Sequence, residues 1–162
     1  MLLINVPLLF RAQIHAYGSA GHFREIGSNG SNMSTAALGI LVNPDHLLTV
    51  GLETHVNKFW DYEFSSMGLG ARSVAELGLI RSNRHRVVLI AKAGAVYMFP
   101  ENPGTALNFT FMGGPAYEYM VNCRNRLRIE AMYTHFSNGK TKGDATNPTW
   151  DGAGINIAWL FR

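Results

Sequence analysis

Eight long segments of this sequence alternate apolar residues with small or polar ones, and most of these segments have ten residues or more. A strand of a soluble protein usually has about five or six residues, whereas a tilted strand needs about nine to eleven to cross a bilayer. Because side chains alternate between the two faces of a strand, the pattern predicts long strands with one apolar face. We place these strands at residues 10–23, 32–43, 46–58, 70–82, 86–99, 107–121, 126–137 and 151–162.

The links between the predicted strands alternate between short and long. Turn-forming residues fill the short links at 43–46, 82–85 and 122–125. Outer-membrane barrels have short periplasmic turns at one end and longer loops outside. We therefore predict an all-β fold, an eight-stranded antiparallel up-and-down transmembrane β-barrel that forms a single domain over residues 1–162. The longer links lie at residues 25–31, 59–69, 100–106 and 138–150.

The two faces of the predicted strands differ in their polarity. One face of segment 126–137 is largely apolar, while the other carries Arg128 and Glu130. Both signs of charge on one face suit a narrow lumen filled by ion pairs, and we expect Glu53 with His55 to form another such pair. The pattern does not say which face points inward, so a soluble, lipocalin-like ligand-binding barrel with an apolar interior is an alternative.

The composition fits a protein that crosses a membrane with strands. Hydrophobic residues make up 47% and charged residues 15% of the chain, yet no run approaches the roughly 18 apolar residues of a membrane helix. The net charge of +3 comes from scattered basic residues, so we expect no nucleic-acid partner. Cys123 is the single cysteine, and the histidines lack the spacing of zinc ligands, so we expect no internal disulfide, metal or cofactor.

The first ten residues are apolar but lack a basic start and a small-residue cleavage site. They make a poor signal peptide. We interpret residues 1–9 as an N-terminal segment left by an export signal that was removed or truncated. This is the feature of the sequence that most favours the soluble alternative.

A motif that can carry chemistry lies at the end of the seventh predicted strand, where residues 134–139 read Thr-His-Phe-Ser-Asn-Gly. His135 and Ser137 are two residues apart and therefore share one face, the one we expect to face the membrane. A serine hydroxyl becomes a nucleophile when a neighbouring imidazole accepts its proton, and that base needs an orienting acid. Asn138 and the backbone N–H of Gly139 follow the serine and are candidates to stabilise an oxyanion.

The orienting acid is predicted from strand pairing. If the last two strands pair so that Ser137 opposes Asp151, the carboxylate shares the face of His135 and lies diagonal to it. Asp144, in the preceding loop, is the second candidate. The Ser-Asn-Gly sequence is also ordinary turn chemistry. A non-catalytic small outer-membrane barrel, structural or adhesive, is therefore a further alternative.

At residues 135–139 the chain resembles the lipid A 3-O-deacylase family, outer-membrane enzymes with eight-stranded barrels. Their motif is His-x-Ser-Asn near the end of the penultimate strand, followed by an acid at the start of the last strand. Size and strand count extend the resemblance over nearly the whole chain, while the motif covers only its end. One departure concerns the acid, which is often a Glu shortly after an Asp-Gly pair, whereas Ala153 and Gly154 follow Asp151-Gly152 here.

The resemblance implies an esterase of the bacterial outer membrane that removes an ester-linked acyl chain from lipid A, or lipopolysaccharide, without a metal. Carried over to this sequence, Ser137 is the nucleophile, His135 the base, Asp151 the acid and Asn138 part of the oxyanion hole. Four basic residues near the predicted outer strand ends are either solvated or contacts for lipid A phosphates. These are Arg24, Lys58, Lys140 and Lys142.

Overall fold

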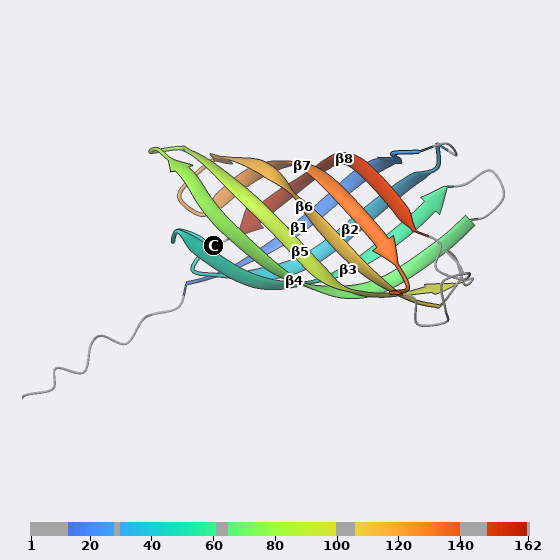
Figure 1. Ribbon diagram of the computed structural model, residues 1–162. Helices are drawn as coiled ribbons and strands as arrows, with labels where there is room; N and C mark the ends of the chain where they lie inside the picture. The colour runs from blue at the N-terminus through green and yellow to red at the C-terminus, as the bar shows by residue number, and fades with distance from the viewer. Residues whose placement is uncertain (1–12, 28–29, 61–64, 100–105, 140–148, 162) are drawn as a thin grey trace, which may run out of the picture.

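Eight strands form a closed barrel in the computed structural model of the chain (Figure 1). Each strand pairs antiparallel with the next along the chain, and the last pairs with the first, which confirms the predicted architecture. The described residues contain no helix that is long and apolar enough to cross a membrane. They comprise residues 13–27, 30–60, 65–99, 106–139 and 149–161. The strands are β1 (Ile14–Glu25), β2 (Asn32–Val42), β3 (Leu48–Trp60), β4 (Ser65–Arg81), β5 (His85–Phe99), β6 (Leu107–Met120), β7 (Asn125–Ser137) and β8 (Trp150–Phe161).

The predicted strand limits agree with the structure to within a few residues, with the largest difference at β4. This strand begins at Ser65, where the sequence predicted a loop that continued to Leu69. The segment that begins at Ser65 is polar and small, but its backbone pairs with β3 as far as Trp60. Backbone pairing with a neighbour therefore extends β4 beyond its apolar pattern. The predicted N-terminal segment, residues 1–9, lies outside the described residues.

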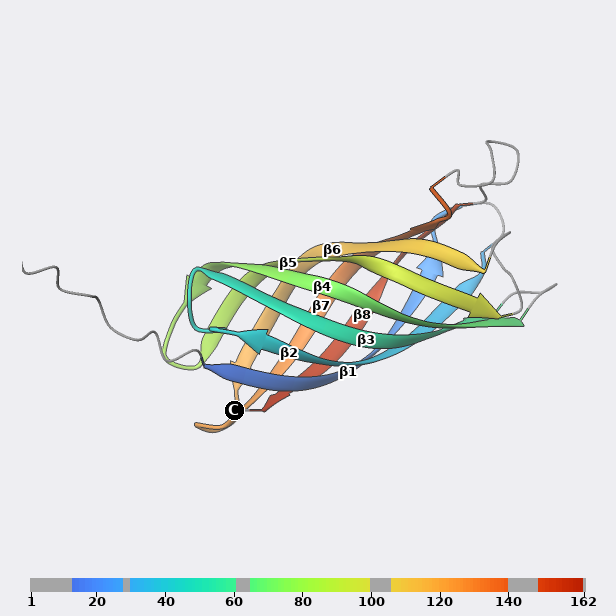
Figure 2. The ribbon, with the colours of Figure 1, turned by 90° about the horizontal axis from the view of Figure 1, so that it is seen from below.

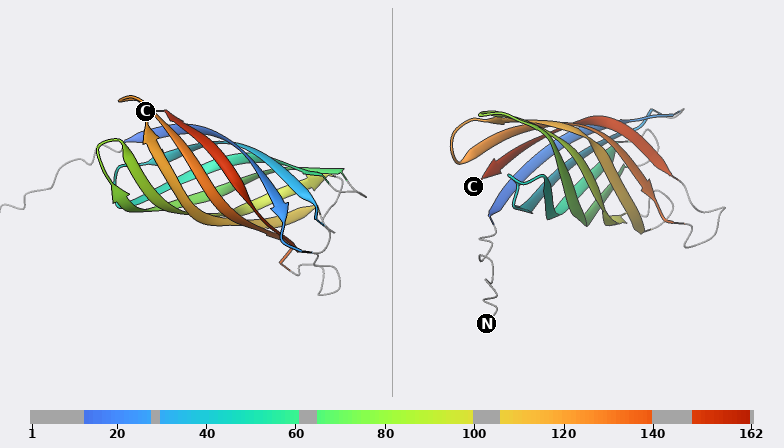
Figure 3. Two further views of the ribbon diagram at one scale, coloured as in Figure 1. Left: turned by 90° about the horizontal axis from the view of Figure 1, so that it is seen from above. Right: turned by 60° about the vertical axis from the view of Figure 1, so that its left-hand side comes forward.

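The short links gather at one end of the barrel, together with the start of β1 and the end of β8 (Figures 1 and 2). They are tight turns, as predicted. The His46 N–H donates to the Asn43 carbonyl at 3.0 Å, and the Ser82 N–H donates to the His85 carbonyl at 2.8 Å. Between these ends the strands run obliquely to the barrel axis (Figure 3). Because short turns mark the periplasmic end of such barrels, the opposite end of this one is the outer end.

The alternation of side chains places nearly all the charged groups of the described strands inside the barrel, next to a cluster of buried apolar side chains, and leaves a largely apolar surface outside. Leu38 is 71% exposed and Leu52 is 62% exposed on the outer wall. A soluble lipocalin-like barrel has the reverse arrangement, so that alternative is wrong for this chain. The buried charged side chains of the described strands are Glu53, Arg72, Glu76, Arg86, Lys92, Glu118, Arg126, Arg128 and Glu130.

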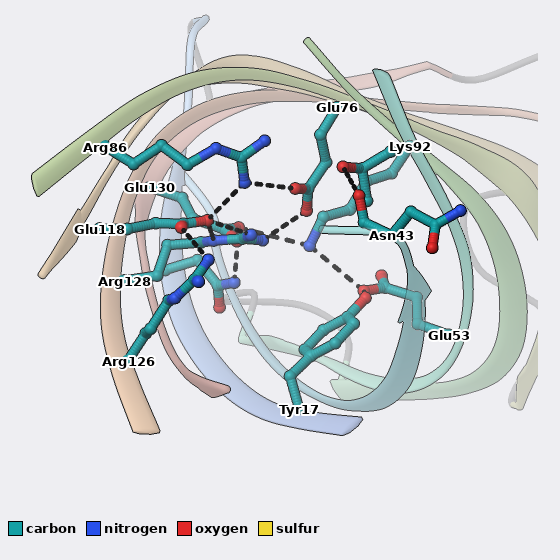
Figure 4. Close-up of polar contacts among 12 residues, drawn as sticks. Tyr17, Asn43, Glu53, Glu76, Arg86, Lys92, Glu118, Arg126, Arg128 and Glu130 are labelled. Carbon is teal, nitrogen blue, oxygen red and sulfur yellow. Dashed lines mark hydrogen bonds and ion pairs between the residues drawn. The ribbon is translucent and has the colours of Figure 1, made fainter. Parts of the chain in front are cut away.

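Arg128 is the centre of the ionic network that fills the lumen (Figure 4). Its guanidinium group contacts Glu118 at 2.5 Å, Glu76 at 2.7 Å and Glu130 at 3.5 Å. These partners come from three different strands. They can all reach Arg128 because the interior of an eight-stranded barrel is just wide enough for side chains to fill it. The predicted pair of Arg128 with Glu130 is thus confirmed as one part of a larger cluster.

The second half of the network surrounds Glu53. Its carboxylate contacts Arg72 at 2.7 Å. It also contacts Lys92 at 3.2 Å and accepts a hydrogen bond from Tyr17, and these three residues are labelled in Figure 4. The expected pair of Glu53 with His55 is wrong. His55 is buried, and its two ring nitrogens have no hydrogen-bond partner among the described residues. Residues on adjacent strands lie closer to one another than residues two apart on the same strand, so Arg72, directly opposite Glu53, takes this role.

Replacement of Arg128 by Met should destabilise the barrel strongly. Removal of one partner from a buried ionic cluster leaves uncompensated carboxylates, which costs about 3–5 kcal/mol. Unfolding by urea in detergent, followed by tryptophan fluorescence, measures the free energy of unfolding. The matched control is Arg124→Met, because Arg124 is exposed in the turn between β6 and β7. Equal stability of the two variants would contradict the central role of Arg128.

Asp45, in the turn between β2 and β3 at the short-turn end of the barrel, makes the stability of the fold depend on pH. Burial opposes ionisation of this carboxyl, but hydrogen bonding to Arg126 and the charges of Arg126 and Arg81 outweigh it and hold its pKa below the usual value. A carboxyl whose pKa is lower in the native state than in the unfolded state stabilises the fold at pH values above its unfolded pKa of about 3.9. This stabilisation is lost as the pH falls through the native pKa. Asp45→Asn should therefore be less stable than the parent at pH 7, with the difference shrinking at pH 3. Unfolding free energies measured at both pH values test this, and an unchanged difference would contradict it.

Candidate active site

The outer end of β7 carries the residues that the sequence singled out. The alternation of the strand turns His135 and Ser137 to the outer wall, while Phe136 between them is buried in the lumen. Asp151, at the start of β8, lies directly opposite His135 in the β7–β8 pair. The two side chains, each about one-third exposed, meet with 2.8 Å between His135 Nδ1 and Asp151 Oδ1. A histidine and a carboxylate are thus joined on the membrane-facing wall.

The strand register that brings them together differs from the predicted one. We predicted Asp151 opposite Ser137, whereas it lies opposite His135. A shift of two residues keeps every side chain on its face, so the acid stays on the predicted side of the strand. The shift replaces a diagonal neighbour of His135 by a direct one.

An aromatic cluster inside the outer mouth fixes this register. Trp150 is buried opposite Phe136, with ring centroids 6.0 Å apart, and its ring packs edge-on against Phe59 at 5.3 Å. The Trp150 Nε1–H also donates to the Ser31 Oγ at 2.7 Å. A buried indole with a satisfied N–H holds its position firmly. Because Trp150 precedes Asp151 directly, this anchor sets the position of the carboxylate.

Tyr133 is a site residue that the sequence analysis did not find. Its hydroxyl donates a hydrogen bond to the same Asp151 oxygen that contacts His135. Tyr133 lies two residues before His135 and so shares its outward face. The period-two pattern therefore contained the signal, but only the register shows that the hydroxyl reaches the acid. Two donors hold this carboxylate in place.

The residues after His135 form the end of the strand. Ser137 lies opposite Phe109 of β6, and Asn138 is completely buried. Gly139 has a φ of +63°, the left-handed region that glycine adopts without strain. A Cβ at this position would also lie 3.1 Å from the Phe109 ring. The tight turn after Ser137 therefore depends on glycine.

Other sequence predictions for this region fall on residues that the structure does not describe. Asp144, the second candidate for the acid, lies in residues 140–148, as do Lys140 and Lys142. Within the described ranges, no group of three or more His, Cys, Asp or Glu side chains is placed to hold a metal ion.

The profile of the lipid A 3-O-deacylase (PagL) family matches residues 28–159. This chain belongs to that family. The match covers β2 to β8 and includes the Ser, the His and the Asp of the site, so the resemblance seen in the His-x-Ser-Asn motif is confirmed. No protein of curated function matches the sequence significantly.

Solved structures show which barrels this fold is similar to. The outer membrane enzyme PagL has a TM-score of 0.68 at 12% identity, with 89% of this chain and 97% of that chain covered. Neisserial surface protein A has a TM-score of 0.65 at 11% identity, and the coverage is 93% and 97%. Outer membrane protein W of E. coli has a TM-score of 0.57 at 10% identity, also with 93% and 97% covered. Membership of this family places the chain in the bacterial outer membrane, and these barrels share its fold.

Proposed function

We propose that this member of the family removes an ester-linked acyl chain from lipid A, with Ser137 as the nucleophile, His135 as the base and Asp151 as the orienting acid. The observation that carries this proposal is the 2.8 Å contact of His135 Nδ1 with Asp151 beside Ser137. With Nδ1 held by the carboxylate, the other ring nitrogen, Nε2, is left to accept the serine proton.

The proposed reaction follows from these positions. Ser137 Oγ attacks the ester carbonyl carbon while His135 Nε2 takes the hydroxyl proton, and a tetrahedral intermediate forms. The backbone N–H groups of Asn138 and Gly139 are the proposed donors to its oxyanion. His135 then gives the proton to the sugar oxygen as the ester bond breaks, which leaves the acyl group on Ser137. Water, activated by the same histidine, hydrolyses this acyl-enzyme and releases the fatty acid.

The location of the site suits a lipid substrate. The candidate residues lie on the outer wall near the long-loop end, where the outer leaflet of the membrane surrounds the barrel. Lipid A can reach them by lateral diffusion within that leaflet. The lumen plays no part in this path, because it is filled by the ionic network of Arg128 and its partners.

Replacement of Ser137 by Ala should abolish deacylation. Loss of a serine nucleophile removes covalent catalysis, and we expect a fall of at least about 10³-fold. Purified lipid A is incubated with the refolded protein in detergent micelles, and the loss of one acyl mass is followed by mass spectrometry. The matched control is Ser73→Ala, because Ser73 is an exposed serine on β4. A Ser137→Ala variant as active as the parent would refute the proposal and favour the non-catalytic barrel.

Substitutions of Asp151 and of Tyr133 should lower activity by different amounts. Asp151→Asn removes the negative charge beside His135 and no longer holds the imidazole in the tautomer that leaves Nε2 free to accept a proton. A fall in kcat of about 10²–10⁴-fold is expected. Tyr133→Phe removes one donor to Asp151 but leaves the contact with His135, so its effect should stay below about tenfold. Measured kcat values for both variants on lipid A test this order. A larger loss for Tyr133→Phe than for Asp151→Asn would argue against Asp151 as the orienting acid.

A further inference from the structure

Formal charge on the outward faces of the described strands is confined to the outer rim. The three charged side chains there are Arg24 on β1, Lys58 on β3 and Asp151 on β8. A basic residue on the lipid face is costly at the middle of the bilayer and costs little near the interface. The two cations therefore lie at the level where the polar headgroups of lipids begin.

Arg24 is a close neighbour of the candidate active site. It lies opposite Ala153 in the β8–β1 pair, while the Ile26 N–H bonds to the Asp151 carbonyl, so Arg24 is diagonal to Asp151. Diagonal neighbours in a sheet are about 7–8 Å apart, which long side chains can bridge. The Arg24 side chain is exposed and has no ion pair within the described part of the chain. The adjacent carboxylate, Glu25, is occupied by hydrogen bonds from Ser31.

Lys58 belongs to a set of polar contacts that spans four strands. Its ammonium group donates to Ser65 Oγ and lies 5.4 Å from the centroid of the Trp60 ring. The Trp60 Nε1–H donates to Ser34 Oγ at 3.2 Å, and His22 Nδ1 lies 3.2 Å from the same oxygen. These contacts form a continuous polar band that runs from β1 to β4 along the outer rim.

The opposite flank of the site, on β6, presents aromatic rings to the outer wall. On β6, Phe109 and Phe111 lie opposite Ser137 and His135, and both rings are exposed. The site is therefore bordered by an aromatic flank on β6 and a cationic flank on β1 to β3. A substrate with a charged headgroup has one favourable orientation on such a wall.

We propose that Arg24 and Lys58 bind the phosphate groups of the lipid A headgroup while the scissile ester lies at Ser137. This inference rests on the proposed function. Lipid A is a phosphorylated glucosamine disaccharide, so its headgroup carries anions on a rigid sugar frame. Arg24, next to the acid, would contact the nearer phosphate, and a guanidinium group matches phosphate oxygens with two parallel hydrogen bonds. Lys58, three strand spacings or about 14 Å from β8, would contact the farther one.

The test compares bisphosphorylated lipid A with fully dephosphorylated lipid A as substrates in mixed micelles. The parent should show a KM about 10²-fold lower for the phosphorylated lipid, because Arg24 and Lys58 each supply a charge-assisted hydrogen bond worth about tenfold. Arg24→Gln should raise the KM for the phosphorylated lipid about tenfold, leave its kcat within about twofold, and leave the KM for the dephosphorylated lipid unchanged. Arg24→Lys should restore part of the loss, and Lys58→Gln should add to it.

The matched control is Arg124→Gln, an exposed arginine at the periplasmic end, which should leave both KM values unchanged. Equal KM values of the parent for the two lipids would overturn the inference, as would an Arg24→Gln variant that raises both KM values alike. If the parent cleaves neither lipid, the proposed function fails by itself. Equilibrium binding of the Ser137→Ala variant to the two lipids then decides the phosphate site, and equal affinity would overturn it.

Discussion

Arg128 and the carboxylates around it are the interaction on which the barrel depends. Lipid offers no partner for backbone or charged groups, so a barrel in a membrane closes its hydrogen-bond ladder and turns its charges inward. In this chain the resulting lumen is not a channel, because Arg128 contacts carboxylates of β4, β6 and β7 at 2.5–3.5 Å. Lys92 extends the network to Glu53 and thus to β3. The interior is a packed ionic core.

A filled interior leaves the outer wall as the place for chemistry. That wall must stay apolar where it meets acyl chains, so polar side chains collect where the strands reach the headgroup layer. His135, Ser137 and Asp151 lie at this rim, and so do Arg24 and Lys58. The same constraint that forces charge into the lumen thus confines the charged groups of the outer wall to one band. The candidate nucleophile and the proposed phosphate contacts are parts of that band.

The aromatic cluster in the outer mouth links the two regions. Trp150 packs inside against Phe59 and Phe136, while the next residue along the chain, Asp151, points outward to His135. Adjacent residues of a strand face opposite sides. An interior anchor of this kind therefore positions an exterior acid, and Tyr133 adds a second hold on the carboxylate from outside.

The sequence by itself determined the number of strands, the polarity of their faces and the shared face of His135 and Ser137, because period-two alternation is a local property of the chain. It also placed the carboxylate of Asp151 on this face, as one of two candidates for the orienting acid. The tertiary structure decided which residues meet. An even shift in register leaves every face unchanged, so the faces were right while the partner of Asp151 was not. Likewise, Glu53 contacts Arg72 rather than His55, because the nearest neighbour of a side chain in a barrel lies on the adjacent strand. The sequence of one strand alone does not show which residue of the next strand it will face.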